Sequence, residues 1–431
     1  MKDIFKYYKS FKGVFIPAIL FLIIGVATGF IGATAFALII FSLKKYKYKL
    51  EFFLIAFLLT YILANNFSGP FAYNGNLRFI ILALALVVLI QINISKVSLA
   101  WYSLPFVIVS FVITLLFSPL GFEALSKSLG YIFVAFTIFK LTDILYVKQD
   151  KIAIILFHFF LSFLIINLVL VINPNFYLVG RFMGLTGNPN GLGMLLVFMY
   201  GVIDLLKQRK ELTSIKKPIL LGYMFLTFAL ILLTGSRTAL GSLIFYVLAN
   251  KVLTNTKMII PYSLFMVLAL LTIYFVSLQD LLTFVGSNID LRLNSIETAS
   301  GRTVVWGVAW EEITRHFWYG QGFMYDTYFI KDYADKYIGL VRERYWGGIW
   351  SSYLSLLLNV GIVGLLAFAW MVIKLYKKAK LKATALIYII TVLLIGVTES
   401  WMAASMNPFT PLFFLYFAIQ NQPLKQTMPN P

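Results

Sequence analysis

The chain has 431 residues, of which 61% are hydrophobic and 12% charged, and its formal net charge is +19. Soluble globular proteins have about 45–50% apolar and about 25% charged residues, so this composition excludes a string of soluble domains and predicts a polytopic membrane protein. The absence of Cys excludes disulfides and thiolate chemistry. The two His, His158 and His316, lie too far apart in the sequence to form a His-rich metal site.

Hydrophobic runs long enough to cross a membrane recur along the whole chain. A spanning helix needs about 20 apolar residues, and about 17 at the short end. By this measure we predict fourteen segments, at 14–28, 29–43, 50–66, 77–95, 98–118, 126–146, 151–171, 190–206, 217–234, 237–254, 258–277, 348–373, 383–400 and 405–421. The first two are short and can form one bent hairpin around Gly29 and Gly32. The expected fold is an all-α integral membrane protein, a bundle of about 12–14 transmembrane helices.

The positive charge follows the predicted loops. If the N-terminus is placed inside, Lys residues gather in alternate loops, above all in the runs 207–217 and 374–382. Because basic residues concentrate in cytoplasmic loops, these loops and both termini are expected on the cytoplasmic side. We therefore interpret most of the charge as the topology signal of a multi-pass protein of the cytoplasmic membrane, and we expect no nucleic-acid partner.

Eight of the nine Arg break this pattern, because they lie on the predicted outer side. A Lys suffices to orient a helix, whereas Arg offers a planar fork that binds phosphate or carboxylate with two hydrogen bonds. Arg181, Arg237 and Arg302 each lie at or shortly before a predicted helix start. A single such Arg is more often a membrane anchor or a carboxylate partner. Helix N-termini favour anions, so the three together predict a diphosphate site on the outer face.

The largest predicted outer loop spans residues 278–347. It is too long for a linker and has its own apolar pattern, so we expect a small subdomain there, between transmembrane regions at 1–277 and 348–431. An amphipathic helix is predicted within it, with Ser300 as its N-cap. Its apolar positions recur at helical spacing: Trp306, Trp310, Ile313 and Phe317. This aromatic face suits a helix lying along the membrane interface. Arg315 and Glu311, four residues apart, are expected to form an exposed ion pair.

Four short patches on the outer side carry a resemblance to a known family. They are Gly180-Arg181 through Asn188-Pro189-Asn190-Gly191, Thr234-Gly235-Ser236-Arg237, Ser300-Gly301-Arg302 with Trp306 and His316 to Gly322, and Trp350 to Leu354 leading to Asn359-Val360-Gly361-Ile362-Val363-Gly364. In order and spacing, between about Gly180 and Asn407, they resemble the O-antigen ligase and O-antigen polymerase (Wzy) superfamily. These are integral-membrane glycosyltransferases with a large outer loop, which agrees with the expected topology.

The resemblance implies a substrate and a set of binding residues. The donor would be an undecaprenyl-diphosphate-linked oligosaccharide held by outer-face Arg, with no metal and no cofactor. By position, Arg181, Arg237 and Arg302 match the family's Arg, and Glu399 resembles a family acidic position. The acceptor would also be lipid-linked. The expected partners are this donor and acceptor, the lipid bilayer, and a chain-length regulator or flippase.

One position departs from the family pattern. Ligases of this family carry a His at the start of the helix after the large loop, in a His-Asn-x-Tyr-Leu-like patch, where this sequence has Trp350 and Ser351. A Trp side chain cannot take a proton from an acceptor hydroxyl. The candidates for a catalytic base are therefore the outer-facing carboxylates Glu343, Glu399 and Asp326.

The missing His favours a polymerase over a ligase. The expected function is a polysaccharide polymerase, of a capsule or exopolysaccharide type, that joins lipid-linked repeat units on the outer face of the cytoplasmic membrane. Three alternatives stay open: a ligase that transfers a finished glycan to another acceptor, a lipid-linked oligosaccharide flippase, and a non-catalytic scaffold. A transporter should carry ionisable groups at mid-membrane, and the predicted spans are nearly free of them.

Overall fold

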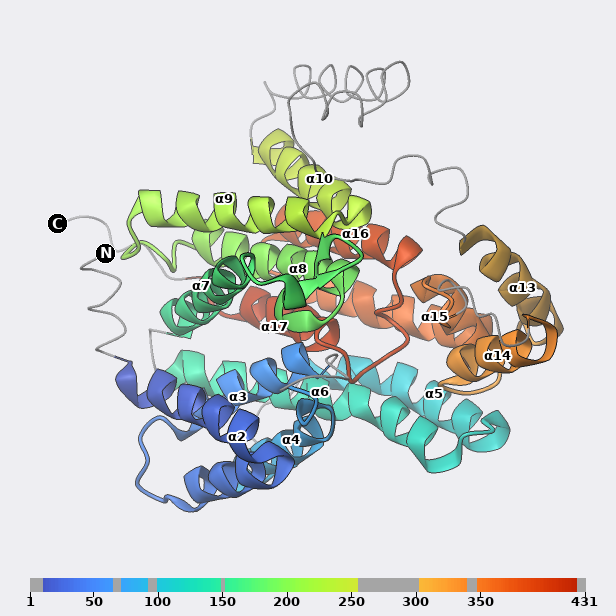
Figure 1. The fold of residues 1–431 in the computed structure, drawn as a ribbon, viewed down its shortest axis with the longest axis horizontal. Coiled ribbons are helices and arrows are strands. Elements are labelled where there is room, and N and C mark those ends of the chain that lie inside the picture. The colour runs from blue at the N-terminus through green and yellow to red at the C-terminus, as the bar shows by residue number, and fades with distance from the viewer. Residues whose placement is uncertain are drawn as a thin grey trace.

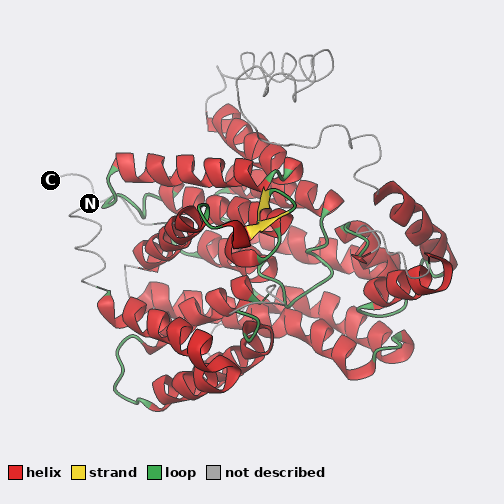
Figure 2. Ribbon diagram, in the orientation of Figure 1, coloured by secondary structure: helices red, strands yellow, loops and turns green. Residues whose placement is uncertain are grey.

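A computed structural model describes most of the chain (Figure 1). The described residues are 11–64, 71–91, 99–148, 152–254, 302–338 and 347–424. Within them the regular structure is almost entirely helical, apart from one short antiparallel hairpin of β1 (Tyr177–Leu178) and β2 (Arg181–Phe182) (Figure 2). The prediction of an all-α polytopic membrane protein is confirmed. The predicted span at 258–277 lies outside the described residues.

The helices follow the hydrophobic runs of the sequence to within a few residues. In the first half they are α2 (Lys12–Ser42), α3 (Lys49–Leu63), α4 (Asn74–Gln91), η1 (Ala100–Ser103), α5 (Leu104–Phe117), α6 (Gly121–Lys148) and α7 (Ile152–Leu170). After these come η2 (Pro174–Phe176), η3 (Gly184–Thr186), α8 (Pro189–Gln208), α9 (Lys217–Thr234), α10 (Arg237–Thr254), α13 (Arg302–Arg315), α14 (Tyr325–Tyr333), η7 (Ala334–Ile338), α15 (Ser352–Lys378), α16 (Lys382–Thr398) and α17 (Phe409–Asn421). Among the described residues, eight helices are long and apolar enough to cross a membrane.

The first helix, α2, is a hairpin. Its 31 residues are interrupted at Gly29, which has φ 67° and ψ −150°. A straight helix of that length would extend about 46 Å. Instead, the Tyr46 hydroxyl beyond its end donates a hydrogen bond to the Gly13 carbonyl near its start. The expectation of one bent hairpin around Gly29 is therefore confirmed, and both of its ends meet on the same side of the bundle.

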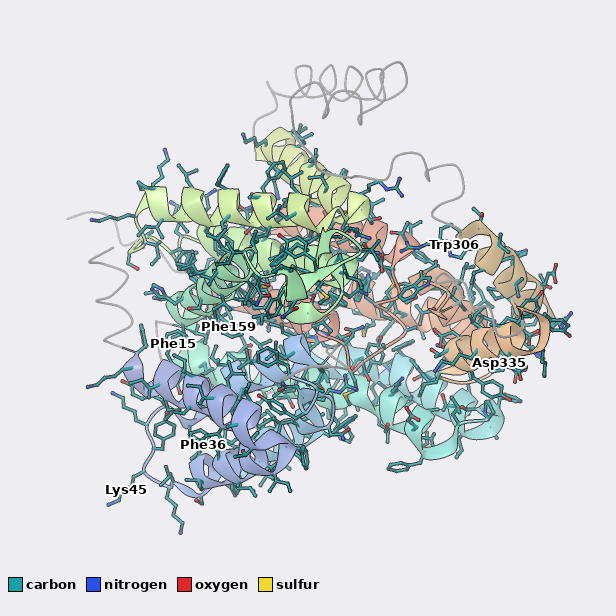
Figure 3. The ribbon with its side chains drawn as sticks, in the orientation of Figure 1. Phe15, Phe36, Lys45, Phe159, Trp306 and Asp335 are labelled. Carbon is teal, nitrogen blue, oxygen red and sulfur yellow. The ribbon has the colours of Figure 1, made fainter. Side chains whose placement is uncertain are left out.

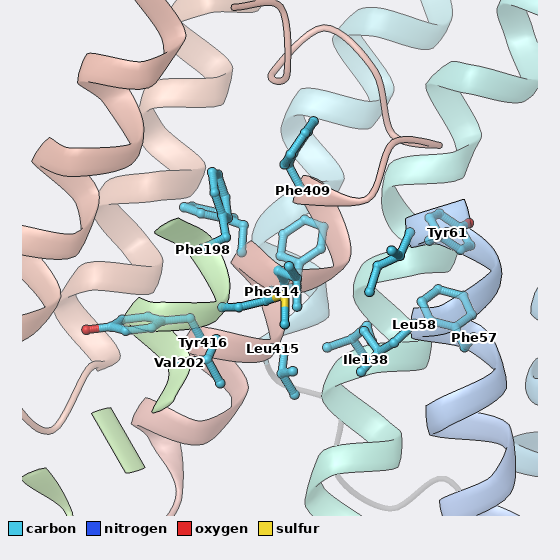
Figure 4. Close-up of a cluster of buried hydrophobic side chains, with 14 of the residues drawn as sticks. Phe57, Leu58, Tyr61, Ile138, Phe198, Val202, Phe409, Phe414, Leu415 and Tyr416 are labelled. Carbon is cyan, nitrogen blue, oxygen red and sulfur yellow. The ribbon is translucent and has the colours of Figure 1, made fainter. Parts of the chain in front are cut away.

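Three helices, α3, α8 and α17, are buried on nearly every side and form the centre of the bundle. A helix that is apolar all round belongs in such a position. Figure 4 shows Phe57 of α3, Phe198 of α8, and Phe409 and Phe414 of α17 in one packed cluster. This rigid centre carries the loops in which the candidate site lies.

Helix α15 is broken where another part of the chain packs into it. Gly361 has φ 61° and ψ −169°, which interrupts the helix and exposes backbone groups on both sides of the break. The segment before α14 pairs with these groups through four backbone hydrogen bonds. They run from the N–H of Gln321 to Leu358 (2.8 Å), Gly322 to Asn359 (2.7 Å), Ile362 to Phe317 (2.9 Å) and Val363 to Trp318 (3.3 Å). A Cβ at Gly320 or Gly361 would overlap the facing backbone, so glycine is needed at both positions.

Helix α13 packs on the protein through a face other than the predicted aromatic one. The helix buries Val305, Ala309 and Ile313 against α14 and α15, whereas Trp310 is 50% exposed, and the placement of the aromatic face at the membrane interface stays a prediction. Either stripe satisfies helical spacing, so the packing partners decide which is buried. The predicted cap, Ser300, lies outside the described residues.

The prediction of an ion pair between Arg315 and Glu311 is wrong. Arg315 instead pairs with Glu312, with 3.2 Å between Nη1 and Oε2. Glu312 is buried and accepts a 2.6 Å hydrogen bond from the Tyr325 hydroxyl. This carboxylate therefore joins α13 to α14, which a solvent-facing residue could not do.

The two ends of the bundle differ in composition. The start of α2 and Lys45 lie toward one end, on the left of the views, and α13 and α14 with Trp306 and Asp335 lie toward the other (Figures 1 and 3). The Lys-rich connections α8–α9 and α15–α16 also lie at the left end.

Candidate functional site

The candidate site is built around Glu399, the residue directly after α16. Ser352 at the start of α15 fixes this segment: its hydroxyl donates to the Glu399 carbonyl (2.6 Å) and accepts from the N–H of Trp401 (2.9 Å). The Glu399 carboxylate is only 6% exposed. A buried carboxylate needs charged or hydrogen-bonding partners, and two Arg supply them.

Arg302, the first residue of α13, makes the direct contact. Its Nη2 lies 3.0 Å from Oε1 of Glu399, and its Nη1 donates to the Thr398 carbonyl. The guanidinium is 15% exposed. Charge-assisted bonds of this kind are stronger than neutral ones, so Arg302 holds the start of α13 against the end of α16.

Arg181 approaches the same carboxylate from the β1–β2 hairpin. Its Nε donates a 2.7 Å hydrogen bond to the Thr234 carbonyl at the end of α9, and its Nη2 donates to Oδ1 of Asn190. The Asn190 side chain in turn hydrogen-bonds Glu399. The Glu399 carboxylate also interacts electrostatically with Arg181. Arg181 and Arg302 therefore converge on one acidic group.

Asn188 explains why α8 begins beside this group. Its side chain accepts from the N–H of Asn190 (3.0 Å) and Gly191 (3.3 Å), which is a regular N-cap. Gly193 lets α8 pack closely on Ser236 and Ala239 at the α9–α10 junction. The start of α8 is thereby brought to the end of α9.

Arg237 is the first residue of α10. The hydroxyl of the next residue, Thr238, lies 2.7 Å from that of Thr398, so this helix start also abuts the end of α16. Arg302 at the start of α13 and Arg181 in β2 therefore approach Glu399, and Arg237 begins the helix that contacts Thr398. We refer to Arg181, Arg237, Arg302 and Glu399 as the arginine cluster.

Burial raises the pKa of Glu399, while the charges of Arg302 and Arg181 and the Asn190 hydrogen bond act to lower it. Guanidinium groups and helix N-termini both favour bound anions. An anionic group that replaces the Glu399 carboxylate would meet the same donors. The cluster can therefore bind an anion with several donors in a low-dielectric setting.

Asp326 lies near the arginine cluster but in a separate contact set. It is in α14, where its N–H donates to Oδ1 of Asn359 (2.9 Å) and its carboxylate lies against Ser355. Burial raises the pKa of Asp326, and Lys127 of α6 acts to lower it. The Ser355 hydroxyl is 3.2 Å from that of Ser400, next to Glu399. The two carboxylates therefore lie on neighbouring segments, Asp326 against Ser355 and Glu399 next to Ser400.

The third candidate base, Glu343, lies outside the described residues. Trp350 precedes α15 with φ 54°, a backbone conformation that is unusual for a bulky residue. Its indole can only donate a hydrogen bond, so Trp350 supplies no base. In the described ranges, no three His, Asp or Glu side chains come together as a metal site would require.

Two residues of the site, Lys127 and Thr398, are not among those predicted from the sequence. Lys127 faces Asp326 from α6, and Thr398 bonds both Thr238 and Arg302. Lys127 had a usable signal, since it is a Lys on the predicted outer side. The carbonyl of Thr398 had none, because any residue type offers one.

Comparison with protein families gives a match to one part of the chain. Residues 222–369 match the family model described as O-antigen ligase. This stretch of the chain is similar to that family. The match runs from α9 into α15 and includes Arg237, Arg302 and Asp326, whereas Arg181 and Glu399 lie outside it. Comparison with curated proteins gave no significant match.

The resemblance inferred from the sequence is confirmed by this match. Members of the family are glycosyltransferase-like enzymes, either polymerases or ligases, that act on lipid-linked glycans. The chain is a multi-pass membrane protein, and the match of residues 222–369 supports an O-antigen ligase or polymerase type of function.

Proposed function

We propose that this chain is a polysaccharide polymerase that joins undecaprenyl-diphosphate-linked repeat units on the outer face of the cytoplasmic membrane. The convergence of Arg181 and Arg302 on Glu399 carries the proposal. Three Arg at the starts or approaches of helices give a diphosphate several donors that need no metal ion. The Lys-rich opposite end supports a cytoplasmic assignment for that end and an outer one for the site.

In the reaction, an acceptor sugar hydroxyl attacks the anomeric carbon of the growing chain. The bond from that carbon to the diphosphate oxygen breaks, and undecaprenyl diphosphate leaves with the bonding electrons. The Arg of the cluster stabilise the negative charge that develops on the leaving oxygen. The hydroxyl proton passes to a carboxylate, and the segments around α13 and α14 position the two substrates.

Asp326 is the carboxylate that we assign as this base. Glu399 is already engaged by Arg302, and this opposite charge makes the Glu399 carboxylate a poorer proton acceptor. Asp326 has no ion-pair contact of that kind among the described residues, and its raised pKa increases its affinity for a proton. Its partner Ser355 lies 3.2 Å, hydroxyl to hydroxyl, from Ser400, the residue after Glu399.

The test is polymerisation by purified protein in liposomes with lipid-linked repeat units, followed by product length. Arg181→Ala, Arg237→Ala and Arg302→Ala should each reduce chain growth by about 100- to 1,000-fold, the cost of losing one donor to a developing charge. Arg315→Ala, which removes a 69% exposed Arg from the same helix as Arg302, is the matched control.

Three outcomes would overturn the proposal. Normal polymer from all three variants would exclude the diphosphate site. A product of unchanged length on a new acceptor would identify a ligase. Movement of the lipid-linked substrate across the bilayer, with no new glycosidic bond, would identify a flippase.

A further inference from the structure

The membrane-embedded part of the bundle contains a groove of about 720 Å³ between α2, α3 and α7. Its volume is in the range of ligand pockets, which are about 300–1,000 Å³. Every lining side chain is apolar except that of Ser162, and the Ser162 hydroxyl donates to the His158 carbonyl (2.8 Å). The groove therefore offers an occupant no hydrogen-bond donor, which fits a hydrocarbon chain.

Three helices shape this groove. Ile55, Leu59 and Leu63, at every fourth position of the fully buried helix α3, form its floor. Exposed side chains of α2, including Ile23, form one wall, and side chains of α7, including Phe159, form the other. Figure 3 labels Phe15 of α2 and Phe159 of α7, which both line the groove. The lining residues of α2 extend from Phe15 to Ala27, about 18 Å at 1.5 Å per residue.

The groove also includes a residue of the segment that carries Arg181. Leu185 of η3 lines the groove, and its N–H donates to Oδ1 of Asn167 near the end of α7 (3.0 Å). Leu185 lies between Arg181 and Asn188 in one short segment. An apolar channel thus meets, at this segment, a site that favours anions. A lipid with a long hydrocarbon chain and an anionic head group matches this arrangement, with the chain in the apolar groove and the head group at the site that favours anions.

We propose that this groove holds the polyprenyl chain of the donor, with its diphosphate at the arginine cluster. The inference rests on the proposed function and extends it to the lipid part of the substrate. Within a bilayer, apolar burial alone gives little preference for one hydrocarbon over another. The preference arises because the bound head group tethers its own chain at high effective concentration beside the groove.

A first experiment measures binding without catalysis. Wild-type protein in nanodiscs should bind undecaprenyl diphosphate more tightly than farnesyl diphosphate, which carries a short prenyl chain. Ala27→Trp places a large side chain at an exposed lining position near Leu185, and it should weaken the long-chain ligand by about ten-fold, or about 1.4 kcal/mol. Leu20→Trp, at an exposed position of α2 outside the groove, is the matched control and should bind normally.

A second experiment uses the absence of Cys from the chain. A benzophenone attached to Ile23→Cys should crosslink radiolabelled undecaprenyl diphosphate, whereas the same label on Leu20→Cys should not. An excess of phosphatidylglycerol should leave the Ile23→Cys product unchanged. Competition by phosphatidylglycerol would overturn the proposal, because the groove would then be a seat for bulk lipid.

The two proposals fail in distinguishable ways. If Arg181→Ala weakens undecaprenyl diphosphate but Ala27→Trp and Leu20→Trp both bind like wild type, the groove proposal is wrong and the proposed function stands. If wild-type protein binds neither prenyl diphosphate, the proposed function itself is wrong.

Discussion

Arg side chains at the two ends of the bundle are held in similar ways but have different surroundings. Arg209, at the Lys-rich end, is 0% exposed; its Nε lies 2.6 Å from Oε1 of Glu211, and its Nη2 donates to the carbonyls of Gln422 and Pro423. Arg302, at the other end, also pairs with one Glu and one carbonyl, but it is partly exposed. Among the described residues, Glu211 is paired with one Arg, Arg209, whereas Glu399 interacts with two, Arg302 and Arg181.

The comparison shows that an Arg–Glu pair by itself does not indicate a binding site. Arg209 ties the end of α17 to the end of α8, which is a structural task. The features that separate the other end are the convergence of several Arg, the helix starts around them, and access to solvent. We therefore expect variants at one end to affect activity and variants at the other to affect stability.

Asp326→Asn should have the largest effect on activity, a loss of about 100- to 10,000-fold, the usual contribution of a general base. The base works only when ionised, and burial raises its pKa. Wild-type turnover should therefore fall, as the pH is lowered, at a higher pH than the ordinary Asp value of about 3.9 predicts. The residual activity of Asp326→Asn should lack this decline. Asp335→Asn, an exposed position in the segment after α14, is the control, and an unchanged pH profile in Asp326→Asn would contradict the assignment.

Arg209→Ala should destabilise the fold by about 3–5 kcal/mol, because it removes the charged partner of the buried Glu211 carboxylate and leaves only the Tyr146 hydroxyl bonded to it. Thermal unfolding in detergent measures this change. Activity per folded molecule should stay close to wild type. Lys207→Ala, at an exposed position two residues before Arg209, should change neither quantity. A loss of turnover in folded Arg209→Ala would remove the distinction between the two ends.

Arg302→Lys should reduce turnover by about ten-fold, since Lys keeps the charge but loses the planar fork. The salt bridge to Glu399 can persist, so unfolding should change little. Arg315→Lys on the same helix is the control for general effects on α13. Full activity in Arg302→Lys would mean that charge alone suffices at this position.

Glu399→Gln should have the smallest effect and an opposite sign. Removing a carboxylate that competes for the Arg should tighten the binding of inorganic diphosphate by a few-fold, even if turnover falls. Calorimetry of wild type, Glu399→Gln and the exposed-site control Glu311→Gln measures the difference. Weaker binding in Glu399→Gln would show that the carboxylate is needed to shape the site.

The helices could be predicted because their signal is local: a hydrophobic run of sufficient length has few alternatives in a membrane. The buried face of α13 could not, because Trp310 and Val305 both satisfy helical spacing and only contact with α14 and α15 chooses between them. The same limit applied to the site. Helix starts and the excess of Arg predicted which Arg to consider, but the Glu399–Arg302 contact joins residues 97 positions apart. No pattern along the chain specifies such a pairing.

The break in α15 limits how this protein can be divided. The segment at 317–322 completes the backbone hydrogen bonding of a helix assigned to another region of the sequence. A chimaera that exchanged the large loop without α15 would leave carbonyls and amides of a transmembrane helix unpaired, each at a cost of several kcal/mol in hydrocarbon. The loop and this helix are therefore expected to be inherited and exchanged together, so that diversification of substrate range would have to proceed through both at once.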